Sequence, residues 1–295
     1  MRILAVNCGS STLKFELFDI TGESRRRQAR GIVDGVGKKE GAVIEFDRSE
    51  SPQRRYVGNH REASLVMLAR LGAAGLLQGL DGVGHRIVHG GDRFRRTALV
   101  TPDVLGAIDS LTELAPLHNQ PSLDALHVLM EALGGVPNVA VFDTAFHRTM
   151  PDESRLYAIP LDLADRHHVQ RYGFHGLAHR YMVERCAALM SMPRERLRII
   201  SLQLGNGCSA AAVMGGRSID TSMGFTPLEG LVMGTRSGDI DPSLAGFIAA
   251  REKVDMATVD GWLNKQSGLL GISGRSSDMR ELLEAGQAGD RLASL

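Results

Sequence analysis

The sequence predicts an α/β fold of two domains. A chain of 295 residues is long enough for one large domain or two ordinary ones. Strand-like and helix-like segments follow one another in mixed order, which favours α/β over all-α and all-β architectures. A strand, a turn of Gly, Ser and Asn, and a second strand occur over 2–20 and again over 199–213. This repeat suggests two halves built on one plan.

The first half opens with the first of these hairpins. The apolar run 3–6 predicts a strand, residues 7–11 have the composition of a turn, and alternating Leu13, Phe15 and Leu17 predict the second strand. Residues 21–60 are polar and rich in Arg, Lys and Gly, so we expect exposed hairpins there. Apolar periodicity then predicts helices over 62–77, 102–114 and 121–133, and strands over 84–89 and 139–142.

The second half begins near residues 146–151, where we place the domain boundary. A helix-like pattern covers 177–190, and strand-like runs flank the turn 205–209. Residues 220–242 then form a long irregular segment, which inside a compact domain usually builds a site. It carries Arg236, glycines that let a ligand approach the backbone, and the carboxylates of Asp220, Glu229, Asp239 and Asp241. The alternative, a solvated surface loop, would not need the apolar residues interleaved there.

Composition and charge restrict the class of protein. Basic and acidic residues number 34 each, so the net charge is zero and we expect no nucleic-acid partner and no membrane surface. The three cysteines form no C-x-x-C pair and no zinc spacing, which favours a reduced cytosolic compartment. The N-terminus enters a strand without a signal-peptide pattern, and no apolar stretch approaches a membrane span. A cytoplasmic location is therefore expected.

Two turns and two strand ends are candidates for binding anions. Successive backbone N–H groups in turns 7–11 and 205–209 would form anion nests, with Lys14 in reach of a phosphate. Neither of the two best-known nucleotide-loop sequences is present, and a purely structural role remains the alternative. Arg86 lies on a short strand that ends in paired glycines, and Asp143 follows an apolar strand. Their alternatives are an arginine paired with a core carboxylate and a helix cap.

The segment 172–179 contains two histidines at a spacing that raises the question of zinc. His175 and His179 are four residues apart, but the glutamate of H-E-x-x-H is missing and Gly176 is a poor mid-helix residue. His175 is more attractive as a hydrogen-bond donor to a developing anion. In the turn 116–119, Leu117 is a candidate for lining a pocket. The alternative is that this turn is an ordinary helix-to-helix connection.

Together these segments resemble the acetate kinase family, over essentially the whole chain. The matching motifs are N-x-G-S-S-x-L-K at 7–14, G-H-R-x-V-H-G-G at 84–91, L-A-P-L-H-N at 114–119, F-D-T-A-F-H at 142–147, Y-G-F-H-G at 172–176, L-G-N-G at 204–207 and the run 220–242. The family has the fold of sugar kinases, heat-shock cognates and actin. The resemblance implies two ribonuclease H-like βββαβαβα cores with an interdomain cleft, in domains 1–148 and 149–295.

The resemblance also implies an activity and a set of site residues. The reaction is the reversible Mg²⁺-dependent transfer of the ATP γ-phosphoryl group to acetate, giving acetyl phosphate, by a homodimer. The implied catalytic residues are Asp143, His175 and Arg236, with Asn7 near the metal. The implied substrate-binding residues are Arg86, Val88, Leu117, Phe174 and Pro227. The implied nucleotide-binding residues are Lys14, Gln203, Leu204, Gly205, Asn206, Gly207, Asp278, Met279 and Arg280.

General chemistry assigns Asp143 a different role from that of a base. A carboxylic acid with a pKa around 4 to 5 is already ionised at neutral pH, so acetate needs no proton removed. Orienting Mg²⁺ through water, or orienting an arginine, is the role we expect.

The sequence departs from the family in several places. Gln203 stands where the family usually has His, Gly176-Leu177-Ala178-His179 replaces Gly-Thr-Ser-His, and Gln120 replaces a proline. Family members continue for roughly a hundred residues beyond the position of Leu295, with a Gly-Gly-Ile-Gly-Glu-Asn adenosine turn and an acidic metal ligand. We therefore expect a truncated chain with an incomplete second domain and impaired activity. The alternatives are an inactive remnant that binds small carboxylates or phosphate, and a propionate kinase.

Overall fold

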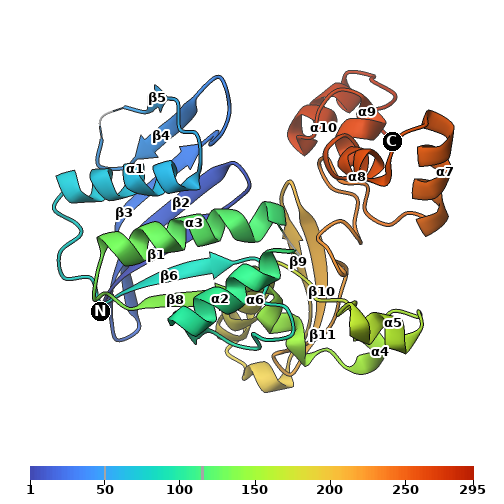
Figure 1. Ribbon diagram of the computed structural model, residues 1–295. Helices are drawn as coiled ribbons and strands as arrows, with labels where there is room; N and C mark the ends of the chain where they lie inside the picture. The colour runs from blue at the N-terminus through green and yellow to red at the C-terminus, as the bar shows by residue number, and fades with distance from the viewer. Residues whose placement is uncertain (50, 114–115) are drawn as a thin grey trace. The chain divides into compact units, whose positions relative to one another are not determined.

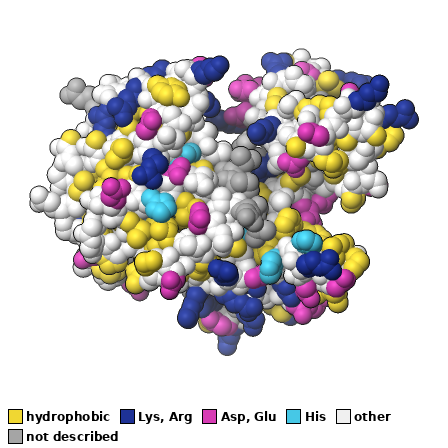
Figure 2. Space-filling model, viewed as in Figure 1, with side chains coloured by type: hydrophobic (Ala, Val, Ile, Leu, Met, Phe, Trp, Pro, Cys, Tyr) yellow, Lys and Arg dark blue, Asp and Glu magenta, His cyan; other side chains and the backbone are white. Residues whose placement is uncertain are grey.

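The computed structural model describes residues 1–49, 51–113 and 116–295, with the backbone alone at 113 and 116–118. It divides into two compact units, Met1–Ala145 and Phe146–Leu295, which are described separately (Figure 1). On the face drawn in Figure 2, basic and acidic side chains are interspersed, as the net charge of zero suggests. Among the described residues, none of the helices is long and apolar enough to cross a membrane.

Unit 1 is built on one mixed sheet. Its strands lie in the order β5-β4-β3-β2-β1-β6-β8-β7; β1 pairs antiparallel with β2 and parallel with β6, which pairs parallel with β8. The strands are β1 (Arg2–Cys8), β2 (Thr12–Thr21), β3 (Ser24–Asp34), β4 (Ala42–Phe46), β5 (Gln53–Arg55), β6 (Gly82–Ile87), β7 (Ala98–Leu99) and β8 (Asn138–Phe142). The hairpins expected over 21–60 are present, but they extend this sheet and bury Val33, Ile44 and Phe46, so the expectation of full exposure was wrong.

In the described part of unit 1, three α-helices connect strands of the sheet. They are α1 (His60–Ala73), α2 (Pro102–Ser110) and α3 (Pro116–Ala132). Helix α1 ends four residues earlier than predicted, because Gly75 adopts a left-handed backbone (φ 67°) one residue after the C-cap. Helix α3 begins five residues before the predicted start and contains Pro121, which the sequence pattern had placed at its first position.

The alternation of side chains gives the sheet of unit 1 two different faces. One face carries Leu4, Val6, Leu13 and Phe15, which join the buried cluster that α1 and α3 cover (Figure 1). The residues between them point to the opposite face, because successive side chains in a strand alternate. The sequence thereby places Asn7, Lys14 and Arg86 together on the face away from this core.

Unit 2 repeats the opening hairpin. Strands β9 (Arg198–Leu204), β10 (Cys208–Met214) and β11 (Arg217–Thr221) form an antiparallel sheet in the order β11-β10-β9. No strand parallel to them occurs in the described part of this unit. The helices are α4 (Asp152–Arg155), α5 (Leu161–Arg166), α6 (Gly176–Leu189), α7 (Pro242–Glu252), α8 (Met256–Lys265), α9 (Gly268–Ser273) and α10 (Met279–Gln287).

Helix α6 covers one face of this small sheet. Val183 of α6 packs with Ala211 and Val213 of β10 in a buried cluster. On β9, alternate apolar residues are exposed: Ile200 by 72%, Leu202 by 50% and Leu204 by 69%. The sheet of unit 2 thus has one covered face and one open apolar row.

Candidate active site

In unit 1, a buried ion pair fixes Arg86. Its Nη2 lies 2.5 Å and its Nε 3.1 Å from Oδ2 of Asp143, and its Nη1 donates to Oδ1 of Asn7 at 2.9 Å. Asp143 is 1% exposed and begins the 3₁₀ helix after β8, while the Arg86 side chain is 26% exposed. Three strands of one sheet therefore hold one guanidinium in a fixed orientation.

The electrostatics of this pair keep Arg86 charged. Burial by itself would lower the pKa of the guanidinium, but the charge and hydrogen bonds of Asp143 outweigh burial and raise it. The second oxygen of Asp143, Oδ1, is buried and has no hydrogen-bond partner among the described residues. Since buried acceptors are normally satisfied, this oxygen is a place for a water, a hydrated cation or a ligand donor.

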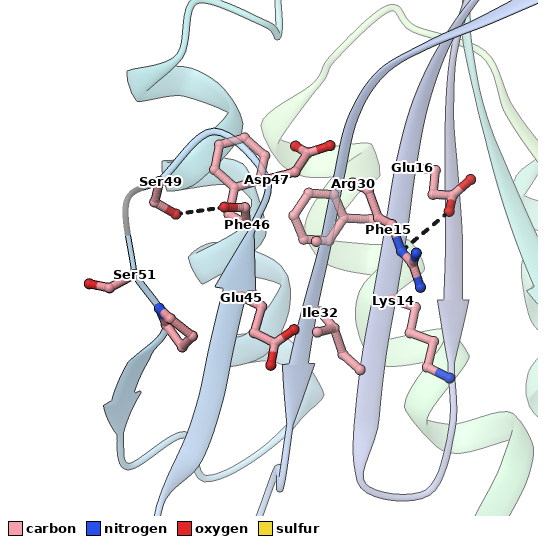
Figure 3. Close-up of a pocket in the computed structure, with 12 residues that line it drawn as sticks. Lys14, Phe15, Glu16, Arg30, Ile32, Glu45, Phe46, Asp47, Ser49 and Ser51 are labelled. Carbon is pink, nitrogen blue, oxygen red and sulfur yellow. Dashed lines mark hydrogen bonds and ion pairs between the residues drawn. The ribbon is translucent and has the colours of Figure 1, made fainter.

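Lys14 joins the same face of the sheet. Arg86 pairs with Asn7 in the parallel β1–β6 register, and Asn7 pairs with Lys14 in the antiparallel β1–β2 register. Directly paired residues share a face, so the three side chains form a polar row. The row continues to Ile32 and Glu45, which line a pocket of about 510 Å³ with Lys14 at its border (Figure 3).

The segment after β6 is clamped by backbone contacts. The Asn119 side chain accepts from the N–H of His89 at 3.0 Å and donates to the carbonyl of His89 at 3.1 Å. The N–H of Gly90 donates to Oγ1 of Thr144 at 3.0 Å. Val88 is buried within this clamped segment. The side chain of Leu117 lies outside the part of the chain that the structure describes.

In unit 2, His175 has an unusual backbone. It is the N-cap of α6 and adopts a left-handed conformation with φ 57°. The carbonyl of Phe174 accepts from Nε2 of His147 at 3.0 Å, and Nδ1 of His147 accepts from the hydroxyl of Ser218 at 2.9 Å. A side chain at Gly173 would lie 2.7 Å from the His147 ring. His147 therefore holds the turn that presents His175 at the start of α6.

The ring of His175 is fixed from behind by a hydroxyl. Its Nδ1 lies 2.9 Å from Oγ of Ser209, and the same oxygen lies 2.8 Å from Nε2 of His179. The other nitrogen of His179 lies 2.9 Å from Oγ of Ser201. Both nitrogens of His179 are thus engaged by serines, which disfavours the zinc pair. Among the described residues, no group of three His, Cys, Asp or Glu side chains could hold a metal.

Arg236 is a half-buried cation of unit 2. Its Nη1 donates to the carbonyl of Pro227 at 3.0 Å, and none of the ion pairs among the described residues involves it. Burial lowers the pKa of its guanidinium. A Cβ added at Gly207 would lie 3.3 Å from Nη1 of Arg236 and 3.8 Å from Nε2 of His175. A side chain at position 207 would therefore stand beside both groups.

The carboxylates of 220–242 have structural roles. Glu229 binds Arg171 at 2.7 Å and the hydroxyl of Tyr157, and Asp239 accepts from the N–H of Gly230 at 2.8 Å. Asp241 is the N-cap of α7, and Asp220 accepts from the N–H of Thr221. The glycines at 224, 230, 234 and 238 mostly admit close contacts within the protein. These contacts hold the segment together, and the interpretation that its polar groups also face a ligand stays a prediction.

The predicted nucleotide segments meet at Gly234. A Cβ there would lie 2.1 Å from Oδ1 of Asn206 and 3.2 Å from the carbonyl of Ser277, and the N–H of Gly234 donates to the carbonyl of Asn206. Asp278 caps α10 and pairs with Arg280 at 2.7 Å, and the hydrogen bond from Arg280 lowers the pKa of Asp278 to about 2. Gln203 and Leu204 end β9, and Gly205 begins the β9–β10 turn.

Sequence patterns did not find Ser209, Ser201 or His147. Each is a single polar residue in or beside a regular element, and only their burial and contacts distinguish them. His147 does belong to the motif at 142–147, but nothing in the sequence indicated that its ring would donate to the carbonyl of Phe174.

The duplicated hairpins, with an arginine cluster in one unit and a histidine–arginine cluster in the other, define an α/β protein with cationic groups beside both hairpins. The chain belongs to the Acetokinase family, whose sequence model matches residues 2–295. It is 44% identical to the acetate kinase of Halothermothrix orenii over 303 residues, covering 100% of this chain and 75% of that protein. It is 45% identical to the acetate kinase of Staphylococcus carnosus, covering 99% and 74%.

Two solved structures have the same fold as this chain. The crystal structure of Porphyromonas gingivalis acetate kinase superposes with a TM-score of 0.90 at 37% identity, covering 99% of this chain and 75% of that one. A propionate kinase from Francisella tularensis superposes with a TM-score of 0.91 at 39% identity, with the same coverage. The chain spans about three quarters of the length of these relatives.

Proposed function

We propose that this chain is an acetate kinase. A carboxylate oxygen of acetate attacks the γ-phosphorus of ATP, the bond from that phosphorus to the bridging oxygen breaks, and ADP leaves with its electrons. No proton has to be removed from acetate. The observation that carries the proposal is Arg236: a half-buried guanidinium that joins none of the ion pairs among the described residues and lies, like His175, beside Gly207.

Unit 2 would stabilise the transferring phosphoryl group. Phosphoryl transfer depends on positioning and on neutralising charge over the equatorial oxygens. Arg236 offers a fork of donors, and His175 offers a ring nitrogen near the same point beside Gly207. His175 also lies at the N-terminus of α6, where the helix dipole favours negative charge.

Unit 1 would hold charged parts of the reactants. Arg86 is presented for a carboxylate or phosphoryl oxygen, with Lys14 along the same polar row for nucleotide phosphates. Asp143 acts on the reaction through Arg86, which it orients, so its role is positioning and not that of a base.

Mg²⁺ fits the side chains of this cluster as a hydrated ion. Mg²⁺ usually keeps several waters and takes one or two protein oxygens together with substrate phosphates. The unpartnered Oδ1 of Asp143 and the amide oxygen of Asn7, which has a second lone pair, would hold such an ion. When bound, the ion would neutralise phosphate charge.

The remaining assignments follow the family resemblance. Gln203, Leu204, Gly205, Asn206 and Gly207 would contact the nucleotide with Asp278, Met279 and Arg280. Val88, Leu117, Phe174 and Pro227 would surround the acetate methyl group. A cytoplasmic homodimer without nucleic-acid or membrane partners completes the proposal. The similarity to the Francisella tularensis propionate kinase favours propionate as a second substrate, because one methylene changes selectivity by only about 1–3 kcal/mol.

Trapping acyl phosphate as the hydroxamate tests this function. The chain is incubated with ATP, Mg²⁺ and either acetate or propionate, beside the acetate kinase of Staphylococcus carnosus. We expect acetate-dependent product, reduced roughly hundredfold or more in Arg236→Ala. Arg251→Ala on α7, which removes an exposed arginine, is the matched control. Acetyl phosphate binding without turnover would favour the inactive alternative, and faster turnover of propionate would favour the propionate kinase.

A further inference from the structure

A buried file of polar side chains, joined one to the next by hydrogen bonds, ends at the ring of His175. Ser201 of β9, His179 of α6 and Ser209 of β10 follow one another to Nδ1 of His175, with successive separations of 2.9, 2.8 and 2.9 Å. His179 and Ser209 are 0% exposed and Ser201 is 4% exposed. Buried polar groups are costly unless each is satisfied, so the protons in this file cannot be placed independently.

The position of Ser209 couples the two rings. Its Oγ lies between Nδ1 of His175 and Nε2 of His179, and a hydroxyl has a single proton. If Ser209 accepted from both rings, its own buried proton would lack an acceptor, because the described residues offer Oγ of Ser209 no third partner. Ser209 therefore donates to one ring and accepts from the other. The tautomer of neutral His175 is therefore set by the tautomer of His179.

The hydroxyl of Ser201 sets which group donates in each hydrogen bond of the file. Its hydroxyl has two acceptors within reach, Nδ1 of His179 at 2.9 Å and the thioether sulfur of Met182 at 3.7 Å. A ring nitrogen is much the better acceptor, since a thioether accepts only weakly. Ser201 then donates to Nδ1 of His179, so the proton of that ring is on Nε2. From there the ring donates to Ser209, and Ser209 donates to Nδ1 of His175.

The remaining proton of His175 is then on Nε2. This is the nitrogen that lies 3.8 Å from the point where a Cβ of residue 207 would stand, and Nη1 of Arg236 lies 3.3 Å from the same point. An N–H at that place donates to an anion, whereas a lone pair there would repel one. We propose that Ser209 is a positioning residue, which fixes His175 as the Nε2–H tautomer so that the ring donates to the transferring phosphoryl group. The second half of this statement rests on the proposed function; the first half does not.

Nitrogen NMR of the full chain labelled with ¹⁵N-histidine measures the tautomers directly. In the wild-type chain with His175 neutral, we expect Nδ1 at the shift of an unprotonated nitrogen and Nε2 at that of a protonated one. In Ser209→Ala the ratio of the two tautomers should fall about fivefold, the effect of losing one hydrogen bond. A wild-type ring protonated on Nδ1 would overturn the proposal.

A second variant tests the coupling from a distance. Ser201→Ala leaves the contact between Ser209 and His175 in place but removes the hydroxyl that orients His179. We expect the tautomer ratio of His175 to fall in this variant too. Ser64→Ala, which removes an equally buried hydroxyl bonded to a helix carbonyl in α1, should leave the ratio unchanged. A response of His175 to Ser209→Ala alone, in variants with native amide spectra, would contradict the file.

Kinetics separate the two halves of the proposal. Ser209→Ala should lower kcat about fivefold with little change in KM, and Ser209→Thr, which keeps the hydroxyl, should restore the tautomer ratio and the rate. Unchanged kcat in Ser209→Ala, despite a shifted tautomer, would remove the role in phosphoryl transfer. A wild-type chain without phosphoryl transfer would contradict the proposed function, while the tautomer measurement would still decide what Ser209 does.

Discussion

At the scale of single residues, Arg86 and Arg236 differ in the groups that they contact. Arg86 is held by Asp143 and Asn7, whereas Arg236 contacts a carbonyl and joins none of the ion pairs among the described residues. The sequence motifs predicted both arginines, together with Asp143 and His175. They could not predict which arginine already has a carboxylate, because that depends on the register of β1, β6 and β8.

His85 gives unit 1 a sensitivity to acid. Burial lowers the pKa of His85 to about 4, although its hydrogen bond with Asn138 acts in the opposite direction. The unfolded chain, with an ordinary histidine pKa of about 6.5, binds more protons than the folded chain between the two values. Stability is therefore full above about pH 6.5 and falls as the pH drops toward 4, by up to about 3 kcal/mol from this group.

Urea unfolding at pH 7 and pH 4.5 measures this effect. His85→Gln keeps an amide donor for Asn138 and cannot become charged, so it should lose less stability on acidification than the wild type. His127→Gln, at an exposed position of α3, should lose as much as the wild type. Equal losses in the wild type and in His85→Gln would refute the assignment.

At the scale of elements, the sequence predicted the strands better than the loops. Alternation identified the second strand of the first hairpin, and apolar runs around a turn of Gly, Asn and Ser identified the other. Pro102 and the glycines after residue 133 marked two helix ends to within a residue. The start of α3 was missed because Pro121 suggested a first helical position. The folding of 220–242 was also missed, since the partners of its carboxylates, Arg171 and Tyr157, lie far away in the sequence.

Gly224 tests how tightly that segment is packed. A Cβ at this position would lie 1.6 Å from Oε2 of Glu229 and 2.1 Å from the hydroxyl of Tyr157. Gly224→Ala should therefore lower the free energy of unfolding by roughly 2 kcal/mol or more. Gly246→Ala in α7, where a Cβ meets nothing within 4 Å, should be neutral or stabilising. Thermal unfolding of both variants and the wild type measures these effects. An unfolding midpoint of Gly224→Ala equal to that of the wild type would contradict the tight packing around Gly224.

At the scale of the whole molecule, the family and the fold were predictable because long motifs cover the entire chain. The expected duplication is present in the hairpins of both units, while the parallel strands that follow β3 in unit 1 have no counterpart in the described part of unit 2. The serine–histidine file could not be predicted, because its four residues come from three elements and have no sequence spacing in common.

The open apolar row of β9 predicts self-association. Ile200, Leu202 and Leu204 are exposed along one side of a strand at the edge of its sheet. Leu202→Lys should lower the average mass measured by sedimentation velocity. Leu65→Lys, at an exposed position of α1, should not change it. A wild-type chain that sediments as a single monomer at high concentration would contradict this prediction.

The central claim is that this chain transfers a phosphoryl group between ATP and acetate with Arg236 at the site of transfer. The most direct measurement is ATP formation from ADP and acetyl phosphate, followed by luminescence in wild type, Arg236→Ala and Arg236→Lys. We expect Mg²⁺-dependent ATP formation by the wild type and a loss of roughly hundredfold or more in both variants, since lysine lacks the fork of donors. No ATP from the wild type, or equal rates in all three, would contradict it.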